Sequence, residues 1–221
     1  MPVRKIPKNH LVVTGSFASR KNGQMDAFES LLEKEYMLLL DFDERVASFE
    51  PQPVIIQIPG MAKGYVPDVL VRYHPDFESG EIPKPLLTEI KHTDDLERNA
   101  EKYAPKFEAA KNFALERGWD FRITTQVEIR TQRLANLKFL REYRNIEPAI
   151  HDSSQIIQIV RENKGILPVD ELLDCLTSTD DDRLHWLPII WHAIVIRNLV
   201  IDWDQSIHHG TVLCLPGMSY E

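Results

Sequence analysis

The sequence predicts an α/β protein with a mixed sheet flanked by helices, followed by a small, mainly helical domain. Short β-rich runs alternate with helical stretches in the first two thirds of the chain, and three helical stretches follow one another in the last third. The length of 221 residues suits one domain with a smaller second one. We expect an N-terminal arm over residues 1–24, an α/β domain over residues 25–147 and a C-terminal domain over residues 148–221.

The first two elements are an arm and a long helix. Residues 1–24 are expected to form the arm, because prolines interrupt them and their second half is small and polar. The stretch Met25–Asp41 is rich in helix formers and has neither Gly nor Pro, so it predicts a helix. Glu29 and Glu33 lie one turn apart on the flank of its apolar face, whereas Glu35 falls within that face. A charged residue there is unusual unless it is paired or faces a site.

Strands and a crossover are expected next. The β-rich runs are Val54–Ile58, Tyr65–Tyr73 and Leu86–Lys91, and a proline-rich loop joins the last two. A helical pattern covers Asp95–Gly118, in which Pro105 should begin or kink a helix. Residues 120–129 predict a strand, and a basic helix follows over about residues 131–143. This order predicts a βαβ crossover with Leu86–Lys91 and Phe121–Thr125 as parallel neighbours.

The last third predicts a compact helical module. Its expected helices are Ser153–Glu162, Val169–Leu176 and Leu184–Arg197. Residues 199–215 are two apolar runs around a polar turn with Gly210, which is typical of a hairpin. Three helices that close on a hairpin predict a winged-helix-like domain.

Charge is distributed unevenly along the chain. The net charge of −8 argues against a protein that coats nucleic acid with a uniformly basic surface. Residues 1–25 nevertheless carry +5 and residues 121–145 carry +4, whereas residues 148–221 carry −7. The two basic segments are the expected footprint on DNA, although they can also be solvated faces. The acidic C-terminal domain fits a protein partner better than DNA.

The cellular setting follows from what the sequence lacks. Neither of the two cysteines lies in a C-x-x-C pair, so a disulfide framework is not expected. No apolar run resembles a signal peptide or reaches the length of about 18 residues that a membrane helix requires. We expect a cytoplasmic protein without a membrane association.

Two neighbouring strands carry the residues that indicate chemistry. Asp68 lies at the start of one strand. On the next strand, Glu89 and Lys91 alternate with Ile90, so Glu89 and Lys91 project to one face. Two carboxylates on adjacent strands form an oxygen site for Mg²⁺, for which Mn²⁺ is an alternative. The lysine can orient an attacking water and stabilise charge on a scissile phosphate. An E-x-K on a strand can also be a surface ion pair.

This pattern is the PD-(D/E)xK arrangement of restriction-endonuclease-like nucleases. Around it, the chain resembles the TnsA family, the endonuclease subunit of heteromeric cut-and-paste transposases, over roughly residues 20–145. The blocks that carry the resemblance are residues 28–35, 49–53, 65–71 and 87–91. The resemblance implies that Glu33, Asp68, Glu89 and Lys91 are catalytic, and that Asp68, Glu89, Glu33 and Ile90 bind the metal. The position of Glu35 within the apolar face leaves it open as an alternative to Glu33.

The resemblance also implies a reaction and partners. Such a subunit nicks the 5′ ends of a transposable element, while a DDE recombinase (TnsB-like) cuts and joins the 3′ ends. An AAA+ ATPase regulator (TnsC-like) engages the C-terminal part, and double-stranded DNA at the transposon ends is the substrate. Two other functions stay open: a stand-alone restriction or repair nuclease, and a non-catalytic adaptor that links DNA to a protein.

Overall fold

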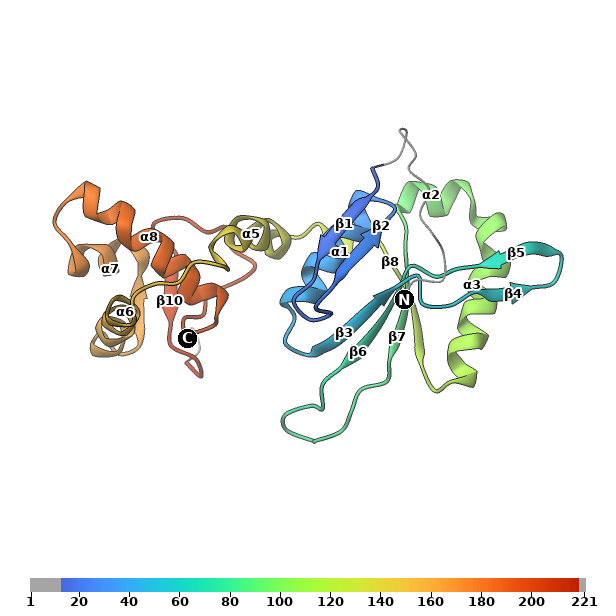
Figure 1. Cartoon of the computed structure of the whole chain (residues 1–221), viewed down its shortest axis with the longest axis horizontal. Helices are drawn as coiled ribbons and strands as arrows, with labels where there is room; N and C mark the ends of the chain where they lie inside the picture. The colour runs from blue at the N-terminus through green and yellow to red at the C-terminus, as the bar shows by residue number, and fades with distance from the viewer. Residues whose placement is uncertain (1–12, 219–221) are drawn as a thin grey trace. The chain divides into compact units, whose positions relative to one another are not determined.

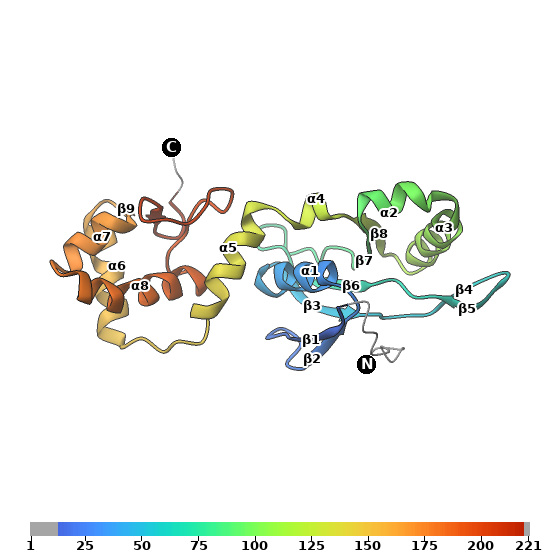
Figure 2. The same cartoon turned by 90° about the horizontal axis from the view of Figure 1, so that it is seen from above.

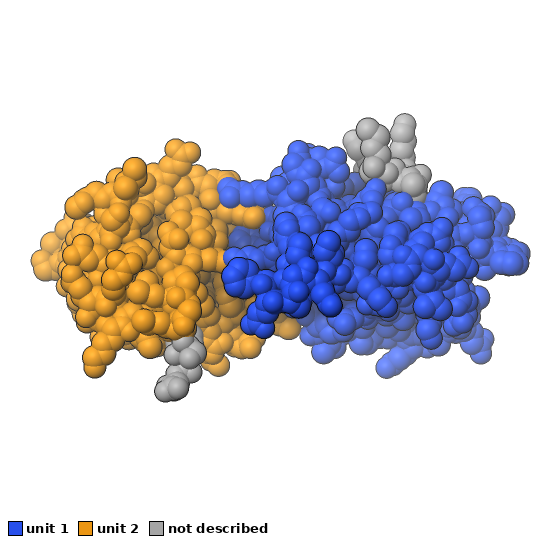
Figure 3. All heavy atoms as spheres, turned by 90° about the horizontal axis from the view of Figure 1, so that it is seen from below, with its two compact units in different colours: residues 1–130 blue, residues 131–221 orange. Residues whose placement is uncertain are grey.

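The computed structural model describes residues 13–218. Residues 1–12, half of the expected basic arm, lie outside the described part. The chain forms two compact units, residues 1–130 and residues 131–221, which Figure 3 colours separately. Within the described part, no helix is both long enough and apolar enough to cross a membrane.

A mixed four-stranded sheet forms the centre of the first unit (Figure 1). Its strands, in spatial order, are β3 (Val46–Pro51), β6 (Val69–Tyr73), β7 (Leu86–Ile90) and β8 (Asp120–Thr124). Strand β6 is antiparallel to both of its neighbours, β3 and β7, and β7 and β8 are parallel. The predicted mixed sheet and its parallel pair are therefore confirmed.

Helices cover both faces of this sheet (Figures 1 and 2). On one face, Ala110 and Ala114 of α3 (Ala100–Glu116) share a buried core cluster with Leu87 of β7. On the other face, the Tyr36 hydroxyl of α1 (Leu31–Phe42) lies 3.4 Å from the Thr88 hydroxyl of β7. Successive strand residues point to opposite faces. Helices flanking a mixed sheet are the predicted fold class.

The first helix begins later than the sequence predicts. Instead of starting at Met25, it starts after Ser30, whose hydroxyl accepts a hydrogen bond from the Glu33 backbone N–H at 3.1 Å. A serine followed three residues later by a glutamate is a known signal of a helix start. That signal outweighs the helix-forming composition of residues 25–29.

The described half of the expected arm forms a β-hairpin together with the first residues of the predicted helix. Strands β1 (Gly15–Ala18) and β2 (Met25–Phe28) pair antiparallel. The buried Asp41 carboxylate of α1 accepts hydrogen bonds from the Ser19 hydroxyl and the Arg20 backbone N–H, both at 3.0 Å. Asn22 exchanges hydrogen bonds with the backbone of Phe49 in β3. The prediction of an arm was wrong here because polar side chains satisfy the backbone and fix the segment to the domain.

Two proline positions also differ from expectation. The predicted strand Tyr65–Tyr73 is split between β5 (Met61–Tyr65), which forms a hairpin with β4 (Ile56–Ile58), and β6. Pro67 lies in the break, where no backbone donor is needed. The helical stretch near residue 100 consists of α2 (Thr93–Arg98) and α3, and Pro105 lies inside α3 rather than at its start. It removes a single backbone hydrogen bond, in the second turn of α3.

The predicted strand over residues 120–129 is shorter than expected. Strand β8 ends at Thr124, and the short helix α4 (Gln126–Ile129) follows. Thr125 and Glu128 form a capping box at the start of α4, with reciprocal side-chain and backbone hydrogen bonds. The strand therefore ends where the capping box begins.

The second unit contains the three predicted C-terminal helices. They are α6 (Ile150–Glu162), α7 (Val169–Leu176) and α8 (Asp180–Val195). The predicted hairpin over residues 199–215 is reduced to a bridge between Val200 and Cys214. Strand β10 (Val212–Cys214) pairs instead with β9 (Ile166–Pro168), which lies between α6 and α7. The winged-helix-like arrangement itself stays a prediction.

The basic helix belongs to the second unit, not to the α/β domain. It consists of α5 (Gln132–Leu140) and the 3₁₀ helix η1 (Arg141–Tyr143). The buried Asn136 side chain donates hydrogen bonds to the backbone carbonyls of Trp203 and Gln205, at 3.1 and 2.8 Å. The compact units divide after Arg130, whereas the expected boundary lies after residue 147. The reason is that partners in the second unit complete the buried face of α5.

Candidate active site

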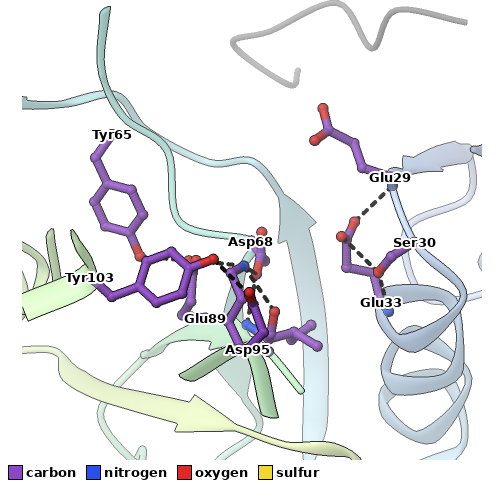
Figure 4. Close-up of polar contacts among 10 residues, drawn as sticks. Glu29, Ser30, Glu33, Tyr65, Asp68, Glu89, Asp95 and Tyr103 are labelled. Carbon is purple, nitrogen blue, oxygen red and sulfur yellow. Dashed lines mark hydrogen bonds and ion pairs between the residues drawn. The ribbon is translucent and has the colours of Figure 1, made fainter. Parts of the chain in front are cut away.

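Asp68 is fixed against the end of β7 by its own backbone and side chain. Its backbone N–H donates to the Thr88 carbonyl at 3.1 Å, and its carboxylate Oδ2 accepts from the Ile90 backbone N–H at 2.7 Å. The backbone N–H of Lys91 donates to Thr124 of β8 at 3.1 Å. The central strands therefore hold Asp68 beside the Glu89-Ile90-Lys91 segment (Figure 4).

The Lys91 ammonium lies among three oxygen atoms. Its Nζ is 2.8 Å from Glu89 Oε1, 3.0 Å from the Ile90 carbonyl oxygen and 3.5 Å from Asp68 Oδ2. These atoms belong to Glu89, Ile90 and Asp68, three of the residues that were predicted to bind the metal. The Ile90 side chain is buried in the core, so this residue can offer only its carbonyl oxygen. A positive charge is thus held at the point where the oxygen atoms converge.

Tyr65 is part of this site and was not predicted. Its hydroxyl donates a hydrogen bond of 2.5 Å to Glu89 Oε2, whereas Lys91 Nζ lies 2.8 Å from the other oxygen, Oε1 (Figure 4). A tyrosine three residues before Asp68 in sequence gave no signal of this contact, because the break between β5 and β6 separates the two. A second tyrosine, Tyr103 of α3, donates instead to Asp95 at 2.6 Å.

Glu33 is held by the start of its own helix. One oxygen of its carboxylate accepts from the Glu29 backbone N–H at 2.8 Å, and the other accepts from the Ser30 hydroxyl at 2.9 Å (Figure 4). Glu35 forms an ion pair with Arg130 instead. Both glutamates lie on α1, and the negative charge of Asp68 acts on Glu33.

The carboxyls of this site influence one another. Burial and the negative charge of Asp68 raise the pKa of Glu33 and that of Glu89, each to about 7. Burial also raises the pKa of Asp68, which the Lys91 ammonium opposes. Burial lowers the pKa of Lys91, but the charges of Asp68 and Glu89 outweigh it, so the pKa lies above its ordinary value. One ammonium group therefore faces more carboxyl groups than it can neutralise.

These donors fit a hard divalent cation. Mg²⁺ is held by one or two carboxylates and keeps several waters, so Asp68, Glu89 and the Ile90 carbonyl suffice as protein ligands. Among residues 13–218, no group of three or more histidine, cysteine, aspartate or glutamate side chains could hold a metal ion. Glu33, expected as a further ligand, is thus not brought together with both Asp68 and Glu89.

Comparison with known families identifies the chain. A family model described as TnsA-like endonuclease N terminal matches residues 43–126, and one described as TnsA endonuclease C terminal matches residues 128–203. The chain belongs to the TnsA endonuclease family. The TnsA domains make it a transposase endonuclease subunit, and the resemblance stated from the sequence is confirmed. No curated protein matches the chain.

The matched ranges cover most of the site. Asp68, Glu89 and Lys91 lie within the range of the TnsA N-terminal model, and Glu33 precedes that range. The C-terminal TnsA model begins at residue 128, close to the division of the two units after Arg130. The basic helix α5 is therefore part of the C-terminal TnsA domain by both criteria.

Proposed function

We propose that this chain is a metal-dependent DNA endonuclease that hydrolyses phosphodiester bonds at the 5′ ends of a transposable element during cut-and-paste transposition. One observation carries the proposal: the Lys91 ammonium lies among Asp68, Glu89 and the Ile90 carbonyl, where oxygen ligands and a lysine converge on one point. Membership of the TnsA endonuclease family supports the reaction class.

Each residue has a defined task in this proposal. Asp68, Glu89 and the Ile90 carbonyl would hold Mg²⁺ or Mn²⁺. The bound ion would supply Lewis acidity toward the phosphate oxygens. Lys91 would orient the attacking water and stabilise the negative charge that develops on the phosphate. Glu33 would act as the upstream carboxylate, with a second ion near it. In support, the negative charge of Asp68 helps to raise the pKa of Glu33 to about 7, so the two carboxyl groups interact.

Partners follow from family membership and charge. We propose that the substrate is double-stranded DNA at the transposon ends, and that a TnsB-like DDE recombinase processes the other strand. A TnsC-like AAA+ ATPase would engage the C-terminal domain, since residues 148–221 carry a net charge of −7. Residues 121–145, with +4, would contact DNA phosphates. A cytoplasmic, DNA-associated location belongs to the same proposal.

A strand-specific nicking assay tests the proposal. The substrate is a duplex that carries the transposon end, labelled on each strand in turn, and the reaction contains the DDE recombinase and Mg²⁺. Asp68→Asn should abolish the 5′ nick. Asp120→Asn, the same change at the exposed start of β8, is the matched control and should nick at the wild-type rate. A wild-type rate of nicking by Asp68→Asn would overturn the proposal.

Two other outcomes separate the alternative functions. Cleavage of a duplex without transposon ends by the purified chain alone would favour a stand-alone restriction or repair nuclease. DNA binding that is unaffected by Mg²⁺ and never followed by cleavage would favour a non-catalytic adaptor. Nicking that is lost when Mg²⁺ is omitted from the wild-type reaction would exclude the adaptor, and the dependence on transposon ends and the recombinase distinguishes the stand-alone nuclease.

A further inference from the structure

The Tyr65 hydroxyl contacts one of the two carboxylate oxygens of Glu89. The hydrogen bond to Oε2 is 2.5 Å long, and Oε1 lies 2.8 Å from Lys91 Nζ. Both Tyr65 and Glu89 are buried, with exposed fractions of 5% and 3%. Each oxygen of Glu89 thus has a partner, and the two partners together fix the direction of the carboxylate plane.

Tyr65 is itself held firmly. It ends β5, pairs with Ile56 of β4, and packs in the cluster that contains Leu70 and Leu87. The Lys106 ammonium lies 5.9 Å from the centre of its ring. The Tyr65 hydroxyl has one hydrogen, which it donates to the acceptor-only carboxylate of Glu89.

The short segment of residues 65–68 therefore contacts three consecutive residues at the end of β7 and just beyond it. Tyr65 contacts Glu89, and Asp68, three residues later, contacts the Ile90 N–H and Lys91. The tyrosine adds no charge to the site, unlike a lysine or arginine in the same place. It can orient Glu89 without reducing the negative charge that a cation requires.

We propose that Tyr65 is a positioning residue, which holds Glu89 so that Oε1 faces the cation position. This inference rests on the proposed metal-dependent function. Residues that hydrogen-bond a metal ligand from behind typically change metal affinity or activity by about 10–100-fold when they are removed. Removal of the hydroxyl should free the Glu89 carboxylate to rotate, which weakens the site without removing a ligand.

The neighbouring tyrosines provide a matched control. Tyr36 of α1 is half-buried, and its hydroxyl lies 3.4 Å from Thr88, the residue before Glu89 but on the opposite face of β7. Tyr36→Phe therefore removes a hydroxyl next to the same strand without touching Glu89. A purely structural role of Tyr65 predicts the same result for Tyr65→Phe and Tyr36→Phe.

The experiment measures Mn²⁺ binding to the full chain by titration calorimetry, without DNA. Tyr65→Phe should raise the Mn²⁺ Kd about tenfold, while Tyr36→Phe should leave it at the wild-type value. In the nicking assay, Tyr65→Phe should require about tenfold more Mn²⁺ for half-maximal rate. Excess Mn²⁺ should restore most of the rate, and the KM for DNA should not change.

Three results would overturn the inference. An unchanged Mn²⁺ Kd in Tyr65→Phe, with a wild-type protein that binds Mn²⁺, would overturn the role of Tyr65 alone. A wild-type protein that binds no Mn²⁺ and nicks no DNA would overturn this role together with the proposed function. Thermal unfolding checks the fold, and a Tyr65→Phe protein that does not fold would assign Tyr65 to structure.

Discussion

Glu35 and Arg130 form an ion pair in which the carboxylate Oε2 lies 2.8 Å from the guanidinium Nε. The pair joins α1 to the residue that ends α4. Glu35 is therefore used within the fold, which explains a charged residue on the apolar face of its helix. Glu33 has a pKa that the charge of Asp68 helps to raise. Glu33, the other glutamate that the sequence left open, therefore interacts with a strand carboxylate of the site.

This difference predicts opposite results for two otherwise equal substitutions. Glu33→Gln should lower the nicking rate by about a hundredfold or more, because it removes a carboxylate of the site. Glu35→Gln should keep the rate and cost about 1 kcal/mol of unfolding free energy, since its partner Arg130 is 44% exposed and solvent screens the pair. Nicking assays and urea unfolding of both variants check this. Lost nicking in Glu35→Gln with intact Glu33→Gln would reverse the assignment.

The sequence predicted the centre of the site because strand geometry dictates it. Alternation along β7 places Glu89 and Lys91 on one face, and the parallel pairing of β7 with β8 follows from the handedness of a crossover. Contacts between side chains that lie far apart in the sequence follow from no such pattern, so they were not predicted. Tyr65 reaches Glu89 only because the chain breaks at Pro67, and Asn22 fixes the N-terminal hairpin through the backbone of Phe49.

The position of the domain boundary could not be predicted from the sequence for a related reason. Ile146-Glu147-Pro148 has the composition of a helix end and a linker, so it suggests a boundary. The actual division depends on which residues complete the buried face of α5. A helix that packs against a later domain has the same periodicity as one that packs against an earlier domain. Only the tertiary partners distinguish the two.

Replacement of Lys91 tests the balance of charge in the site. Lys91→Met should abolish nicking and lower the unfolding free energy of the metal-free protein by about 3 kcal/mol, because buried carboxylates lose their partner. Mg²⁺ should then raise the melting temperature more in Lys91→Met than in the wild type, since the ion replaces the missing charge. Thermal unfolding with and without Mg²⁺ measures both effects. Lys63→Met, on an exposed part of β5, is the control.

The raised pKa values predict how stability depends on pH. Glu33 and Glu89 have pKa values of about 7 in the folded protein, above the ordinary 4.5. Between these values the folded state binds more protons than the unfolded state, so the metal-free protein should lose stability as pH rises from about 4.5 through about 7. Glu33→Gln should reduce this loss, and Asp120→Asn should not. Urea unfolding across that range measures it, and stability that rises with pH would contradict the expectation.

Asp41 should hold the N-terminal hairpin in place. Asp41→Ala leaves the Ser19 hydroxyl and the Arg20 N–H without their acceptor, so we expect a loss of about 2–3 kcal/mol in unfolding free energy. The hairpin leads directly into Glu29 and Ser30, whose groups hold Glu33. Nicking should therefore fall as well, even at a temperature where the protein is folded. Asp43→Ala, which breaks a pair with the exposed Arg45, should cost about 1 kcal/mol or less.

The boundary between the units can be tested with two fragments. A fragment of residues 131–221 contains α5 and η1 together with the core of α6, α7 and α8, so it should unfold in one cooperative transition. A fragment of residues 148–221 lacks Asn136 and Tyr143. Asn136 donates hydrogen bonds to the carbonyls of Trp203 and Gln205, and the Tyr143 carbonyl contacts the ring of His192.

Loss of these partners uncovers buried apolar surface and leaves polar groups without their hydrogen bonds. The shorter fragment should therefore show no cooperative transition in thermal unfolding followed by circular dichroism. In the longer fragment, Asn136→Ala should lower the melting temperature by several degrees, consistent with about 1–2 kcal/mol for a buried hydrogen-bonded amide. Gln158→Ala, on an exposed face of α6, is the control. Equal cooperativity of the two fragments would move the boundary to residue 147, because α5 would then contribute nothing to the C-terminal fold.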